Sequence, residues 1–74
     1  MTIQDKEKVY ELIQGNQIIS SIQKYNRCLE RDFKYAKMDT IADKKMLKKI
    51  LKLKALMQQA SDLATEIEAN YWEY

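Results

Sequence analysis

The 74-residue chain carries 13 basic and 11 acidic side chains, so its net charge is only +2, and it contains no histidine, no proline and a single cysteine. This composition excludes an internal disulfide and argues against a structural metal site, because Cys28 is the only thiol and there is no imidazole. A chain this short forms at most one domain with a thin core, so we expect residues 1–74 to be a single domain stabilised by self-association.

The scarcity of helix breakers, together with 46% apolar and 32% charged residues, predicts an all-α fold. The first predicted arm covers residues 3–37, and its apolar phase changes near the single glycine. After the change the phase is kept by Ile18, Ile22, Tyr25, Leu29 and Ala36. Glycine suits the end of one helix and asparagine the start of another, so we expect this arm to be kinked or broken near Gly15–Asn16. A continuous helix that tolerates one glycine is the alternative.

Residues 38–40 are the predicted turn. Asp39 or Thr40 is expected to cap the second helix, since Thr40 and Asp43 have the spacing of a capping box with aspartate in the usual glutamate position. An antiparallel helical hairpin folded about this turn would place Tyr25 opposite Leu53.

The second predicted arm covers residues 41–72 and has a heptad pattern. One apolar position recurs at alternating steps of four and three at Met46, Ile50, Leu53, Met57, Ala60, Ala64, Ile67, Tyr71 and Tyr74. This spacing is typical of a coiled coil. Leu47, Leu56 and Leu63 widen the stripe, and a stripe this wide needs more than one neighbouring helix. We therefore expect two hairpins to form a homodimeric four-helix bundle, with Leu56 and Leu63 as interface candidates.

Lysines crowd the predicted turn, and they are the candidate residues for binding an anion or a partner: Lys34, Lys37, Lys44, Lys45, Lys48, Lys49 and Lys52. Positive charge at the start of a helix opposes the helix dipole, so helix stability does not explain this placement. The lysines are either a solvated face or a binding site for nucleic acid, another anionic ligand or an acidic protein; a membrane partner is unlikely on this pattern.

The chain ends in a cluster of aromatic residues. Tyr71, Trp72 and Tyr74 are the other interface candidates, because aromatic side chains are enriched where proteins bind one another. The alternative is that they close the end of the bundle by packing on Val9, Tyr10 and Ile13.

No motif assigns the chain to a family, and no nucleophile stands beside a base. We expect a cytoplasmic, non-enzymatic protein-interaction module without a cofactor, acting as a regulator, adaptor or inhibitor that docks on a larger protein. The alternative is a small binder of nucleic acid or another anionic ligand that uses the lysine-rich end. The preference for lysine over arginine fits the A/T-rich codon usage of a low-GC bacterium or its phage or plasmid.

Overall fold

The computed structural model describes residues 1–73, and helix makes up 88% of it. The helical segments, in chain order, are α1 (Ile3–Tyr10), the π-helical turn η1 (Glu11–Gly15), α2 (Ile18–Tyr35), the 3-10 turn η2 (Met38–Thr40) and α3 (Lys44–Glu73). No strand occurs within residues 1–73, so the predicted all-α class is confirmed.

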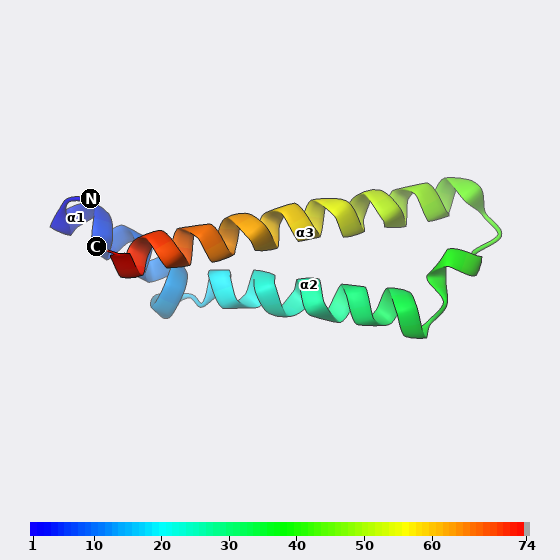
Figure 1. The fold of residues 1–74 in the computed structure, drawn as a ribbon, viewed down its shortest axis with the longest axis horizontal. Coiled ribbons are helices and arrows are strands. Elements are labelled where there is room, and N and C mark those ends of the chain that lie inside the picture. The colour runs from blue at the N-terminus through cyan, green and yellow to red at the C-terminus, as the bar shows by residue number, and fades with distance from the viewer. Residues whose placement is uncertain (74) are drawn as a thin grey trace.

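The molecule is a rod of 52 × 18 × 18 Å in which α2 and α3 lie side by side and run in opposite directions (Figure 1). At one end, which we call the turn end, η2 connects these two helices. At the other, the open end, α1 and η1 lie beside the last turns of α3 (Figure 1). The first arm is interrupted between η1 and α2, where the sequence predicts a break.

The buried core is small and lies at the open end. Among the described residues it consists of Ile13, Ile19 and Ala64, which are 8%, 3% and 1% exposed. Partly buried Val9, Ile22 and Tyr71 pack against it. The segment that includes η1 therefore supplies part of the core, which α2 and α3 alone do not complete.

Toward its middle, the contact between α2 and α3 is polar. Asn26 is only 5% exposed, and its Nδ2 donates a hydrogen bond to Oε1 of Gln58 at 3.1 Å. Gln58 in turn donates from Nε2 to Oδ1 of Asp62 at 2.9 Å, and Gln23 donates from Nε2 to Oγ1 of Thr65 at 3.1 Å. The bonds from Asn26 to Gln58 and from Gln23 to Thr65 join α2 to α3 and hold the two helices in one register.

That register differs from the predicted one. Asn26 contacts Gln58, whereas a hairpin folded about residue 39 would bring it to Lys52. The predicted pairing of Tyr25 with Leu53 is wrong, since these side chains are 60% and 51% exposed. The reason is the long connection, residues 36–43, which lets the first turns of α3 extend past the end of α2 (Figure 1).

The cap of α3 also differs from the prediction. Asp43, rather than Asp39 or Thr40, caps this helix, because its Oδ1 accepts hydrogen bonds from the backbone N–H groups of Lys45 and Met46 at 3.0 and 3.1 Å. The Thr40 hydroxyl instead donates to the carbonyl of Lys37 at 2.6 Å.

At the break in the first arm, Gly15 was expected to end one helix and Asn16 to begin the next. Gln17 occupies this position instead. Gln17 adopts the left-handed conformation, with φ of 54°, and precedes α2 without a side-chain cap. Asn16 is right-handed, and Gly15 is the last residue of η1 with no positive φ. The residue that bears the backbone strain is therefore a glutamine, while the glycine has an ordinary conformation.

If Gln17 and not Gly15 has the strained backbone, then substitution of Gln17 by glycine should stabilise the protein and substitution at Gly15 should have little effect. Gln17→Gly should raise the free energy of unfolding by about 0.5–1 kcal/mol, because glycine adopts positive φ without a steric penalty. Gly15→Ala should be tolerated, because the added Cβ would meet only the flexible end of the Glu11 side chain. Chemical denaturation at one fixed protein concentration tests both changes. A large loss of stability for Gly15→Ala, with no gain for Gln17→Gly, would contradict the assignment.

Candidate interaction surface

Large apolar side chains remain exposed along one side of the α2–α3 pair. We call these residues the open apolar face: Ile18 and Tyr25 on α2, with Leu53, Leu56, Leu63 and Ile67 on α3. Their exposed fractions range from 37% for Ile67 to 60% for Tyr25. A continuous exposed apolar surface on a small protein typically marks a binding surface.

Helical geometry places these residues on the same side. Each of them directly precedes a residue that turns toward the other helix, as Tyr25 precedes buried Asn26 and Leu63 precedes buried Ala64. The other four precede Ile19, Lys54, Met57 and Glu68, all of them buried or half-buried. A step of one residue turns about 100° around a helix. Because α2 and α3 are antiparallel, the same step on both helices leads to the same side of the pair.

The candidate lysines gather at the turn end. Lys34 lies near the end of α2, Lys37 lies in the connection, and the other five lie in the first turns of α3. All seven side chains are exposed, and within residues 1–73 none of them lies within ion-pair distance of a carboxylate. The neighbouring Lys54 differs, since its Nζ stands 5.2 Å from the centre of the Phe33 ring in the contact between α2 and α3.

The aromatic cluster at the open end divides into a packed residue and an exposed one. Tyr71 is half-buried against the core, with its ring centre 6.5 Å from that of Tyr10, and Nζ of Lys6 stands 5.4 Å from its centre. Trp72 stacks edge-on against Tyr71 at 5.0 Å but stays 64% exposed. Packing thus accounts for Tyr71, while Trp72 remains available to a partner. Tyr74 lies outside the described residues.

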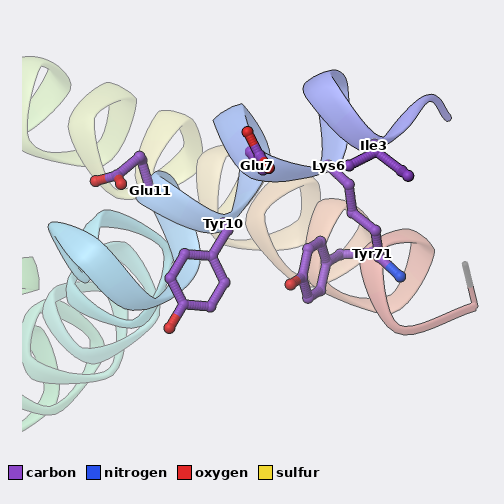
Figure 2. A pocket seen from close by; sticks show the side chains of 6 residues that line it. All are labelled: Ile3, Lys6, Glu7, Tyr10, Glu11 and Tyr71. Atoms are coloured by element: carbon purple, nitrogen blue, oxygen red, sulfur yellow. The ribbon is translucent and has the colours of Figure 1, made fainter.

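A shallow cavity of about 470 Å³ opens between α1 and the end of α3 (Figure 2). It is lined by Ile3, Lys6, Glu7, Tyr10, Glu11 and Tyr71. Figure 2 shows the rings of Tyr10 and Tyr71 side by side, with Lys6 reaching toward Tyr71. The lining combines both charge signs with two phenol rings, and it contains no nucleophile paired with a base.

Part of the open apolar face was predicted from the sequence. The interface candidates Leu56 and Leu63 are exposed on the open apolar face, at 51% and 59%. The prediction missed that Ile18 and Ile67 share this face, and that Asn26 lies in the contact between α2 and α3. A signal was present in the residues that follow Leu53, Ala60 and Ile67. These residues, Lys54, Ser61 and Glu68, form a polar row at heptad spacing beside the apolar one.

A comparison of the chain with protein-family models, with curated protein sequences and with solved structures finds no match. Within residues 1–73, no helix has both the length and the apolar character that crossing a membrane requires. The same residues hold no group of three or more side chains placed to bind a metal ion.

Proposed function

We propose that this chain is a small non-enzymatic protein-interaction module, a regulator, adaptor or inhibitor that docks on a larger protein and also binds a second copy of itself. The open apolar face is the observation that carries the proposal. It consists of four side chains of α3 and two of α2 that remain between 37% and 60% exposed. Burial of such side chains is the main source of affinity between proteins.

The exposed area supports a partner. A compact monomer of 8.8 kDa exposes about 4,800 Å², whereas this chain exposes 6048 Å². The difference of about 1,200 Å² exceeds the roughly 800 Å² that each partner buries in a standard interface. The rod thus exposes enough surface for association with a partner. Its core of three buried residues is small, so burial of further apolar surface would stabilise it.

The width of the apolar stripe on α3 supports a four-helix bundle. One side of the stripe, with Ile50, Met57 and Ala64, is directed toward α2 and is half-buried or buried. The other side, with Leu53 and Leu56, is exposed. In a bundle each helix packs against two neighbours, so two helical hairpins joined through this second side would use the whole stripe.

A larger protein partner would reach the parts of the module that such a dimer leaves outside. Exposed Trp72 and Lys34, which helical geometry places on the opposite side of α2 from Tyr25, are the supporting features. Aromatic residues of this kind anchor interfaces, and unpaired lysines attract acidic surfaces. A cytoplasmic location is part of the proposal, supported by the single free thiol of Cys28.

Self-association is tested by light scattering of the purified protein. At micromolar concentration the wild type should show more than one 8.8 kDa chain per particle, and Leu56→Glu/Leu63→Glu should show one chain, because charge on the face opposes its burial. Leu51→Glu is the matched control, since Leu51 is also an exposed leucine of α3, at 45%, but lies off the face. A wild type that is monomeric and fully helical would contradict self-association.

Docking on a larger protein is tested by affinity capture from a nuclease-treated lysate. A protein retained by the immobilised wild type should be lost with Trp72→Ala and kept with Tyr35→Ala. Tyr35 is 76% exposed and lies near the end of α2, so it controls for the loss of an exposed aromatic side chain. If neither Trp72→Ala nor Leu56→Glu/Leu63→Glu alters the set of captured proteins, capture does not involve the proposed surfaces.

The second candidate function is binding of nucleic acid or another anionic ligand at the turn end. The observation that favours it is the charge distribution, since residues 27–54 carry ten basic and only four acidic side chains. The first turns of α3 extend past α2, so their lysines can approach a polyanion from several directions (Figure 1). Lysine contacts phosphate without reading sequence, so any such binding would be weakly selective.

This candidate predicts binding to a mixed-sequence oligonucleotide whose affinity falls steeply as salt rises, because binding releases counterions. Changing Lys44, Lys45, Lys48 and Lys49 to Glu should abolish that binding. Circular dichroism of the same variant should show helicity that is unchanged or higher, because acidic residues are favoured in the first turns of a helix. If the wild type shows no salt-sensitive binding even at low ionic strength, the nucleic-acid function is wrong.

A further inference from the structure

We propose that the open apolar face is covered by a second copy of this chain lying in the reverse direction, so that the turn end of each copy lies on the open end of the other. The inference rests on the self-association in the proposed function and specifies its geometry. The apolar face adjoins the contact between α2 and α3, so the second copy would extend an existing helical interface.

Charge along the rod determines the direction. Residues 27–54, which form the turn half, carry ten basic and four acidic side chains, whereas the remaining residues carry three basic and seven acidic ones. If two copies pack face to face in the same direction, like charges meet over the whole length. If one copy is reversed, the basic half of each lies on the acidic half of the other, which favours association and suppresses the other arrangement.

The symmetry of the face determines which helices meet. A two-fold axis that reverses the rod and keeps the apolar faces together places α3 on α3 and α2 on α2. A two-fold axis parallel to the rod would instead place α3 on α2 of the second copy, with the two turn ends together. The charge distribution therefore selects contact between the two α3 helices.

The exposed apolar residues of α3 also give the register. Leu53 and Ile67 are seven residues to either side of Ala60, and Leu56 and Leu63 lie nearly symmetrically inside them. A crossing at Ala60 brings Leu53 of one copy level with Ile67 of the other, and the small alanine permits close approach of the two helices. Lys52 then lies level with residue 68 of the second copy, one helical turn or less from its exposed Glu66.

Disulfide trapping tests this geometry in a Cys28→Ser background, which light scattering must first show to associate as the wild type does. Leu53→Cys protein is mixed with Ile67→Cys protein under mild oxidation, and the covalent products are identified by mass spectrometry. The expected main product contains one chain of each kind. Leu53→Cys alone should give none, because two copies of residue 53 would stand about 21 Å apart along the helices, beyond the roughly 7 Å that a disulfide spans between Cα atoms.

A second mixture tests the competing arrangement. Tyr25 lies level with Ala60 within one chain, as the bonds from Asn26 to Gln58 and from Gln23 to Thr65 show. A mixed product of Tyr25→Cys and Ala60→Cys would therefore mean that α3 packs on α2 of the second copy, and it would overturn the inference. A covalent dimer of Leu53→Cys alone would overturn it as well. Either of these products would leave the proposed self-association intact. A wild type that light scattering shows to be monomeric would contradict both the self-association and the inferred geometry.

Discussion

The structure depends on one mismatch: α3 presents more apolar surface than α2 can cover. α3 has 30 residues and α2 has 18, and the apolar stripe of α3 is wider than a single contact between two helices. The contact with α2 therefore uses one side of the stripe and leaves the other in water. The small core, the extended shape and the open apolar face all follow from this mismatch, because a two-helix rod has no interior in which to place the remaining leucines.

Polar residues in the middle of the contact compensate for its weak apolar packing by fixing the alignment. Asn26 is almost fully buried, and its Oδ1 has no hydrogen-bond partner among the described residues. An unsatisfied buried acceptor costs about 1–3 kcal/mol, so this asparagine is not explained by stability. Its bond to Gln58 holds only when the two helices are in one register. A buried polar residue with that effect is a known device for specifying helix alignment.

Helix content and the location of the break could be predicted from sequence because both depend on local properties. The heptad on α3 and the lone glycine near the end of η1 are local signals. The phase of the contact could not be predicted from the apolar pattern. That pattern favours Leu53 over its polar neighbour Lys54 as the inward residue, although Lys54 is the one that packs on Phe33.

The predictions of the α3 cap and of the register between α2 and α3 were wrong for related reasons. Asp39, Thr40 and Asp43 are all good capping residues, and sequence does not rank them when the length of the connection is unknown. Once Asp43 is the cap, the connection is longer than a tight turn and the facing pairs move along α3. The candidate site was partly predictable, since Leu56 and Leu63 were identified from the excess width of the stripe. Predicting that Leu56 and Leu63 share a face with Ile18 and Tyr25 would have required knowledge of the relative direction and phase of α2 and α3.

The position of the core at one end of the rod makes the molecule uneven in local stability. Ile13, Ile19 and Ala64 anchor the open end, whereas the first two turns of α3 extend past α2 and are held by the Asp43 cap and the connecting segment. Segments with few buried contacts open most easily, and their amide protons exchange earliest with solvent. The lysine-rich turns are thus among the segments of the molecule that fray most easily. A ligand that bound there would order this segment as it bound, and its measured affinity would be lowered by the conformational entropy lost in that ordering.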